Sequence, residues 1–151
     1  MKEMTSEEKG KKAEALFINY LDSRKIPYLR IDQEIKTKSA ALKEQNIVRF
    51  DFLIQTRNDV YHIDVKYREK ILIGEDKENR FRIGHDKIKL ISNFADVFNK
   101  DLWLAFTDNL EKPEFYFSTI SCINNYYNVL QEMYNKKYSN FSGTKYVYIP
   151  N

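Results

Sequence analysis

The sequence predicts one α/β domain, and three features of the chain indicate it. With 151 residues the chain has the length of an ordinary domain, and 42% of its residues are apolar, which is enough for one core. Near the middle, two runs with period-two alternation predict a β-hairpin. Before and after this hairpin, two stretches carry apolar residues at helical spacing. We therefore expect residues 1–151 to form a single domain with a sheet and flanking helices.

Residues 5–24 predict the first helix. Thr5 or Ser6 can cap its start, and acidic residues follow in the first turn. Its apolar residues, at helical spacing, are Ala13, Leu16, Phe17, Tyr20 and Leu21. Glu14 lies at the edge of this apolar stripe. It can be an ordinary flanking residue paired with Lys11 or Lys12, or a functional one. After Pro27, residues 28–33 predict the first strand.

The central hairpin pairs residues 47–55 with residues 60–68 across a segment of turn composition. A two-residue loop pairs Asp51 with Lys66, and a four-residue loop pairs Asp51 with Asp64. Either register puts these three side chains on one face, because side chains alternate along a strand. The same face carries Arg49, Leu53, Gln55, Val60, His62 and Arg68. The other face is apolar and aromatic and supplies the core: Phe50, Phe52, Ile54, Tyr61, Ile63, Val65 and Tyr67.

The charged face of the hairpin has two interpretations. Half-exposed sheets put charged residues in water, and opposite charges across a strand pair are mildly favourable. Alternatively, the face is a functional cluster, because core formation does not require two carboxylates and a lysine together. The hairpin alone leaves both interpretations open.

The elements around the hairpin complete the pattern. Residues 36–45 are polar and predict a loop or short helix, and residues 69–83 predict a second, smaller hairpin that projects beyond the core. Asp86 can cap a helix to about Asn99 that is apolar on more than one side, as a crossover helix would be. Residues 101–107 predict a strand inside the sheet. The remaining predictions are a strand at 114–117, a helix at 121–137, a loop at 139–144 and a strand at 145–149.

Composition excludes several classes of protein. The net charge of +3 is mildly basic and does not by itself indicate a nucleic-acid partner. The single cysteine, Cys122, excludes an intramolecular disulfide and a cysteine-based zinc cage. No apolar run approaches the roughly 20 residues that cross a bilayer, and the first residues lack the apolar centre of a signal peptide. We therefore expect no membrane partner and a cytoplasmic location.

The hairpin motif resembles that of the PD-(D/E)XK nuclease superfamily. Asp51 on one strand is followed on the next by Asp64-Val65-Lys66, and Phe50 stands where the family name expects proline. Gly10-x-x-x-Glu14 followed by Tyr20-Leu21 resembles the first helix of archaeal Holliday-junction resolvases and their relatives. The element order over residues 5–107 is similar to the α-β-β-β-α-β core of the restriction-endonuclease-like fold, with residues 108–151 as a C-terminal elaboration.

This resemblance implies a mixed central sheet flanked by helices and a magnesium-dependent DNA endonuclease. By resemblance, Mg²⁺, for which Mn²⁺ can substitute, is bound by Asp51, Asp64, Glu14 and the backbone carbonyl of Val65. Lys66 is then expected to orient or deprotonate the attacking water and to stabilise charge on the phosphate. Glu7, one helical repeat earlier, is the second choice for the helix glutamate.

The implied partners are duplex or branched DNA and a second copy of the chain, since breaking both strands needs two sites. Candidate nucleic-acid contacts are Arg49, His62, Arg68, Lys70, Arg80, Arg82 and Lys87. Lys70, Arg80 and Arg82 can equally be ordinary surface charges. Two other functions stay open: a nucleic-acid-binding protein of nuclease fold that does not cleave, and an RNA-directed nuclease.

Overall fold

The computed structural model describes residues 2–31, 39–40, 44, 50–68, 70–73, 78–125 and 146–150. Side chains are not described for residues 70–73, 78–82, 84–85 and 146–150. The elements are α1 (Ser6–Ser23), β1 (Tyr28–Arg30), β2 (Phe52–Gln55), β3 (Val60–Tyr67), β4 (Lys70–Ile73), β5 (Glu78–Gly84), α3 (His85–Phe98), β6 (Leu102–Thr107), β7 (Tyr116–Thr119) and β8 (Tyr146–Pro150). No helix among these residues is long and apolar enough to span a membrane.

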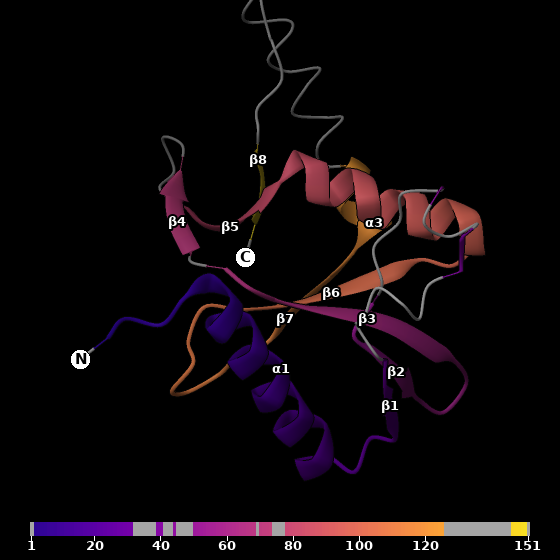
Figure 1. Ribbon diagram of the computed structural model, residues 1–151, viewed down its shortest axis with the longest axis horizontal. Helices are drawn as coiled ribbons and strands as arrows, with labels where there is room; N and C mark the ends of the chain where they lie inside the picture. The colour runs from indigo at the N-terminus through magenta and orange to yellow at the C-terminus, as the bar shows by residue number, and fades with distance from the viewer. Residues whose placement is uncertain are drawn as a thin grey trace, which may run out of the picture.

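Five of the strands form a mixed sheet in the order β1-β2-β3-β6-β7 (Figure 1). Neighbouring strands are antiparallel except for β3 and β6, which are parallel and are connected through α3. The predicted order α-β-β-β-α-β is confirmed by α1, β1, β2, β3, α3 and β6, with β6 inside the sheet as predicted. The predicted small hairpin is β4 and β5, and β8 extends it to a second sheet of three strands.

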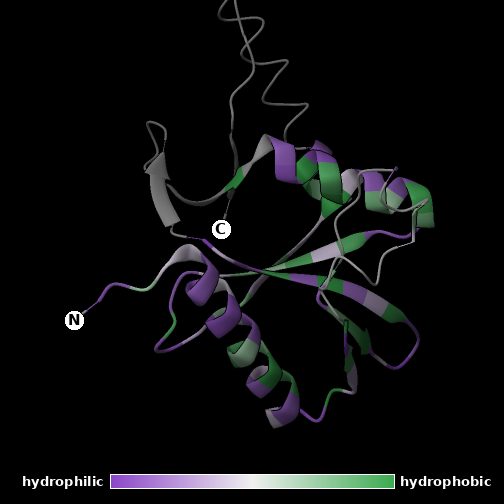
Figure 2. Cartoon of the chain, viewed as in Figure 1, coloured by the Kyte–Doolittle hydropathy of each residue, from purple (hydrophilic) through white to green (hydrophobic). Residues whose placement is uncertain are grey.

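α1 begins with a capping box and packs on one face of the five-stranded sheet. The Glu8 N–H donates to Thr5 Oγ1 at 3.2 Å, and the Thr5 N–H donates to Glu8 Oε2 at 2.7 Å. The turns of α1 alternate between hydrophilic and hydrophobic residues, as an amphipathic helix requires (Figure 2). Its buried stripe joins the apolar side chains of the sheet in one core cluster: Ala13, Phe17, Leu21, Phe52, Ile54, Ile63, Val65 and Ala105.

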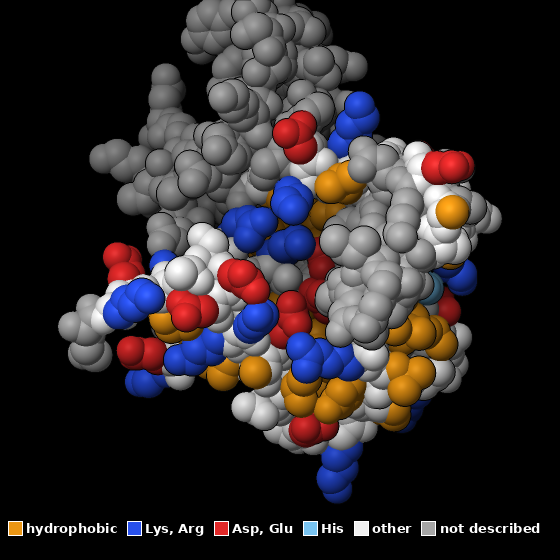
Figure 3. Space-filling view, viewed as in Figure 1, with side chains coloured by type: hydrophobic (Ala, Val, Ile, Leu, Met, Phe, Trp, Pro, Cys, Tyr) orange, Lys and Arg blue, Asp and Glu red, His pale blue; other side chains and the backbone are white. Residues whose placement is uncertain are grey.

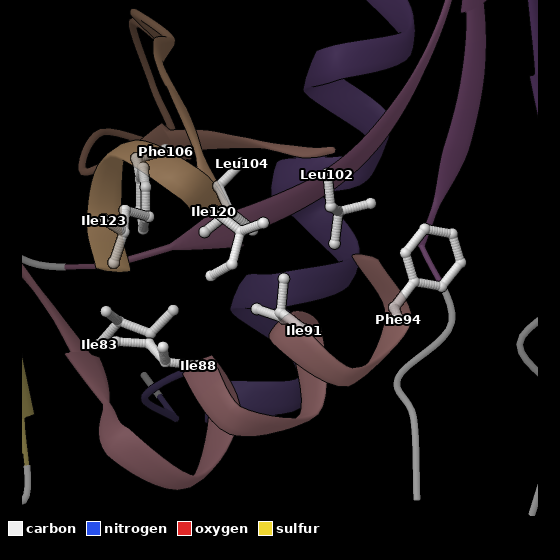
Figure 4. Close-up of a cluster of buried hydrophobic side chains, with 9 residues drawn as sticks. All are labelled: Ile83, Ile88, Ile91, Phe94, Leu102, Leu104, Phe106, Ile120 and Ile123. Atoms are coloured by element: carbon white, nitrogen blue, oxygen red, sulfur yellow. The ribbon is translucent and has the colours of Figure 1, made fainter. Parts of the chain in front are cut away.

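A second core cluster lies on the opposite face, between the sheet and α3 (Figure 4). Its members come from β5, α3, β6 and the helical residues 120–125: Ile83, Ile88, Ile91, Phe94, Leu102, Leu104, Phe106, Ile120 and Ile123. Because side chains alternate along a strand, Ala105 of β6 faces α1 whereas Leu104 and Phe106 face α3. The sheet is therefore covered on both faces, with α1 on one side and α3 on the other (Figure 1).

The β2–β3 hairpin has the four-residue-loop register, in which Gln55 pairs with Val60 and Phe52 with Ile63. The prediction that Phe50 shares a face with Phe52 is wrong. The Phe50 ring lies 4.7 Å from the ring of His62 and packs against the α3-side cluster. The cause is local, since the Asp51 N–H donates to the Ile63 carbonyl at 3.0 Å although Phe52 is the register partner of Ile63. Two residues thus oppose one, as in a β-bulge, and the alternation of side chains breaks at Asp51.

Other predicted boundaries differ more modestly. α3 begins at His85, so Asp86 lies in its first turn and does not cap it. β1 ends at Arg30. β7 begins at Tyr116, which is two residues later than predicted. Residues 120–125 are helical, as the start of the third predicted helix requires. Predictions for residues 32–38, 41–43, 45–49, 74–77 and 126–145 lie outside the described residues.

Candidate active site

The candidate site lies where β3 extends past its partner β2. β2 pairs with residues 60–63 of β3, whereas β6 pairs with β3 along residues 62–67. Asp51 directly precedes β2, and its Oδ2 accepts a hydrogen bond from the Val65 N–H at 2.7 Å. A side-chain carboxylate therefore takes the place that a backbone carbonyl would occupy if β2 continued.

The backbone of Val65 is oriented toward the same place. In an antiparallel ladder, the N–H and C=O of one residue point to the same edge of the strand. Since the Val65 N–H donates to Asp51, the Val65 carbonyl also points to the edge where Asp51 lies. This is the orientation that the predicted role of Val65 requires, and its role as a ligand stays a prediction.

Asp51 and Asp64 are buried, with exposed fractions of 6% and 2%. Asp64 lies in register with Leu104 of the parallel strand β6, so it shares the sheet face that α3 covers. Charged groups on an ordinary wet sheet face remain in water, because burying a carboxylate is costly. These two aspartates therefore do not fit the interpretation of the hairpin as a solvated charged face.

The close approach of the carboxylates changes the protonation of Asp51. Burial is the largest cause, and the negative charge of Asp64, a hydrogen bond with Asp64 and the charge of Glu14 add to it. Together they raise the pKa of Asp51 to about 9, although the Val65 N–H opposes the change. At neutral pH Asp51 accordingly retains its proton, because a second negative charge beside Asp64 is unfavourable.

Lys66 places a positive charge in direct contact with this pair. Its Nζ lies 2.6 Å from Asp64 Oδ2, and the two side chains are only 16% and 3% exposed. Apart from this ion pair, no described residue gives Oδ2 a hydrogen bond. A buried oxygen with spare acceptor capacity is uncommon and favours an additional, cationic or hydrogen-bonding partner.

Glu14 approaches the aspartates from α1. Its Oε2 lies 3.3 Å from Arg30 Nη2 of β1, and the Glu14 side chain is 19% exposed. Burial raises the pKa of Glu14, which Arg30 opposes, and the charges of Asp64 and Lys66 act on it as well. The simple pairing of Glu14 with Lys11 is not observed, because Lys11 pairs with Glu7 at 2.8 Å. The Glu7 side chain in that pair is 77% exposed, so it is far less buried than Glu14.

Arg30 is a residue of this site that the sequence analysis missed. Its side chain is 59% exposed, so its guanidinium can contact both Glu14 and a ligand in solvent. The two residues are 16 positions apart on different elements. No local sequence pattern indicates their contact, which depends on how α1 packs beside β1.

We call Glu14, Asp51, Asp64 and Lys66 the carboxylate–lysine cluster. Acidic side chains gather near the middle of the face seen in Figure 3, with Lys and Arg side chains on both sides of them. Within the described part of the chain, no three acidic, histidine or cysteine side chains are arranged to enclose a metal ion by themselves. Mg²⁺ does not require such a cage, since it commonly binds one or two carboxylates and retains waters. The paired aspartates and the remaining acceptor capacity of Asp64 Oδ2 fit that mode of binding.

The other predicted contacts are dispersed. His62 lies against the rings of Phe50 and Phe94, and burial lowers its pKa, so it is a poor phosphate ligand here. Arg68 Nη1 donates to the Tyr67 carbonyl at 2.7 Å, just after β3. Lys87 is exposed in the first turn of α3. Arg49 lies outside the described residues, and so do the side chains of Lys70, Arg80 and Arg82.

A groove of about 670 Å³ lies on the other flank of α1. It is lined by Leu16, Asn19, Tyr20, Ser23, Arg24 and residues 113–116. The groove shares no residue with the carboxylate–lysine cluster and holds no comparable set of buried charges. It is therefore not part of the candidate active site.

Comparison with known proteins supports the fold. No protein-family model matches the sequence, and a search of curated proteins finds no match. Among solved structures, the chain is similar to Hjc of Archaeoglobus fulgidus, a Holliday junction resolvase from an archaeal hyperthermophile. The TM-score is 0.54 at 13% identity, over 94% of this chain and 88% of that chain. At this identity the likeness shows the fold alone, and it confirms the predicted restriction-endonuclease-like α/β fold.

Proposed function

We propose that this protein is a metal-dependent endonuclease that hydrolyses phosphodiester bonds in DNA. One observation carries the proposal: two buried aspartates, one directly before β2 and one in β3, lie together beside a lysine whose ammonium is 2.6 Å from one of them. Phosphodiester hydrolysis needs positive charge next to the phosphate, an activated water and stabilisation of the leaving oxygen. The likeness of the fold to a Holliday junction resolvase supports the same conclusion.

The aspartates are suited to hold a divalent cation. Asp51 and Asp64 present carboxylate oxygens from two strands, and the Val65 carbonyl points to the same strand edge. Mg²⁺ prefers such oxygen ligands, and Mn²⁺ accepts the same set. When bound, the ion supplies positive charge next to the phosphate and makes water a better nucleophile. Glu14, whose charge acts on both aspartates, is the residue that we propose to hold a water or a further ion.

Lys66 has a different role, because an ammonium cannot coordinate a metal ion. It lies two residues after Asp64 on the same strand, so both side chains point the same way. In the proposed reaction Lys66 as an ammonium orients the attacking water and stabilises charge on the phosphate, or as a neutral amine it accepts the proton of that water. Arg30, half exposed beside Glu14, adds a contact to the phosphate backbone.

The substrate class we propose is duplex or branched DNA. An enzyme that cuts a duplex or a junction must break two strands, and one carboxylate–lysine cluster serves one strand at a time. We therefore propose that the active form is a homodimer with twofold symmetry. Sedimentation of the protein with and without DNA measures this directly.

Cleavage assays test the proposal. Supercoiled plasmid, linear duplex, a four-way junction and labelled RNA are each incubated with Mg²⁺, Mn²⁺ or chelator, and Asp64→Asn serves as the control for contaminating nucleases. We expect the wild type to cleave a DNA substrate with Mg²⁺ and with Mn²⁺, and not with chelator. DNA binding without cleavage would contradict the proposal in favour of a nucleic-acid-binding protein, and cleavage of RNA alone would assign an RNA-directed nuclease.

A further inference from the structure

Gly10 occupies a position in α1 where glycine has no evident use within the protein. Residues 6–23 are continuously helical, so Gly10 lies in the helix interior, and its φ is not in the left-handed region. After proline, glycine is the least favourable residue in a helix interior, because it has the most backbone freedom to lose. The conformation of α1 therefore does not require glycine at this position.

Packing does not require it either. A Cβ built on Gly10 would meet no atom within 4 Å among the described residues. The residue is half-buried, and the direction of its missing side chain is open with respect to the described residues. A Cβ would fit there without displacing any described part of the chain.

This open space adjoins the carboxylate–lysine cluster. Gly10 and Glu14 are four residues apart, so they lie on the same side of α1 and are separated by about 6 Å along the helix axis. The neighbouring residue Lys9 places its ammonium 5.7 Å from the centre of the Tyr67 ring, and Tyr67 directly follows Lys66 in β3. A positive charge and a gap in the side-chain surface thus lie side by side, one helical turn from Glu14.

We infer that Gly10 lets the sugar-phosphate backbone of a bound DNA strand pass in close contact with α1 on its way to the carboxylate–lysine cluster. This inference rests on the proposed function. Glycine allows a ligand to approach the protein backbone closely, since no Cβ intervenes. Lys9 provides the complementary charge for a phosphate at the same place. Gly10 is accordingly a positioning residue for the substrate strand.

Substitutions at Gly10 separate this role from a structural one, because the two predict opposite combinations of effects. Gly10→Ala and Gly10→Leu both introduce strong helix formers, so the melting temperature should rise by about 2–4 °C. In contrast, the Kd for a DNA substrate should rise by about threefold for Gly10→Ala and by about tenfold or more for Gly10→Leu. Cleavage at limiting enzyme should fall in the same order.

The control is Ala15→Leu, which enlarges an exposed side chain on the opposite side of α1. It should leave the Kd and the cleavage rate unchanged. Wild-type affinity and cleavage in Gly10→Leu would overturn the inference alone, and a lower melting temperature in Gly10→Ala would assign the glycine to the fold. A wild-type protein that neither binds nor cleaves DNA would overturn the proposed function and this inference together.

Discussion

Two ion pairs of nearly equal length occupy contrasting parts of this molecule. On the outer side of α1, Lys11 Nζ lies 2.8 Å from Glu7 Oε1, and both side chains are at least 70% exposed. At the end of β3, Lys66 Nζ lies 2.6 Å from Asp64 Oδ2, and both side chains are at most 16% exposed. The two pairs have the same chemistry, and they differ in their access to water.

Because of this difference, helix geometry explains the Glu7–Lys11 pair, whereas the Asp64–Lys66 pair needs another explanation. Residues four apart on a helix are neighbours, so the Glu7–Lys11 pair forms easily and contributes little, because water already solvates both charges. Burying Asp64 and Lys66 removes their hydration, and apolar residues of similar volume would serve stability as well or better. The buried pair, beside a second buried carboxylate, is therefore better explained by function.

The largest effect that we expect is on metal binding. If Asp51 and Asp64 hold Mg²⁺ in the native state, an ion concentration a hundred times the Kd should stabilise the protein by about 2.7 kcal/mol. Asp51→Asn should abolish this stabilisation while the Val65 N–H keeps an acceptor oxygen. Thermal melts over a series of Mg²⁺ concentrations measure the effect.

The exposed pair provides the control for this experiment. Glu7→Gln removes a carboxylate that is far more exposed than Asp51, so its response to Mg²⁺ should equal that of the wild type. An undiminished response in Asp51→Asn would remove Asp51 from the metal site.

The pH dependence of stability is a second difference that we expect between a buried and an exposed carboxylate. The folded pKa of Asp51 is raised to about 9 from its ordinary value of 3.8, so the native state binds this proton more tightly than the unfolded state does. The stability that this tighter proton binding contributes is complete below pH 3.8 and is lost as pH rises through about 9. In chelator, between pH 5 and pH 9, the free energy of unfolding of the wild type should fall by more than about 1 kcal/mol relative to that of Asp51→Asn.

Denaturant unfolding at a series of pH values tests this prediction. Asp96→Asn, a substitution on the exposed side of α3, should instead give a curve parallel to that of the wild type. Parallel curves for Asp51→Asn and the wild type would mean that Asp51 titrates normally. The electrostatic description of the cluster would then be wrong.

A smaller effect is expected at Arg30, which contacts the cluster from its exposed side. If its guanidinium also contacts a DNA phosphate, Arg30→Gln should weaken binding and lower the slope of log K against log salt by about 1. Lys11→Gln removes a positive charge from the exposed pair and should leave the slope unchanged. Equal slopes for the wild type and Arg30→Gln would show that Arg30 pairs with Glu14 alone.

The sequence predicts those features that depend on neighbouring residues. The helix cap at Thr5, the helical stripe of α1 and the alternation within β3 are local patterns, and each is confirmed. The hairpin sequence also brings Asp51, Asp64 and Lys66 to one place, because a four-residue loop sets the register. The element order and the fold follow from these local patterns together.

Features that depend on tertiary contacts could not be predicted in this way. The bulge at Asp51, which moves Phe50 to the α3 side, depends on a single backbone hydrogen bond to Ile63. The Arg30–Glu14 contact depends on how β1 lies beside α1. The burial of the aspartates depends on tertiary packing, and strand alternation predicts a shared face without indicating whether that face is wet.

Single-turnover cleavage by Lys66→Ala and Lys11→Ala, at saturating enzyme and with Mg²⁺, tests the central claim most directly. Both variants remove a lysine from a short ion pair, one buried and one exposed. The carboxylate–lysine cluster predicts that Lys66→Ala lowers the cleavage rate by about 10²-fold or more, because a lost general base or electrostatic stabiliser acts on the transition state. Mg²⁺ should still stabilise this variant, and Lys11→Ala should cleave at the wild-type rate. A rate for Lys66→Ala equal to that of Lys11→Ala would contradict the assignment of this cluster as a catalytic site.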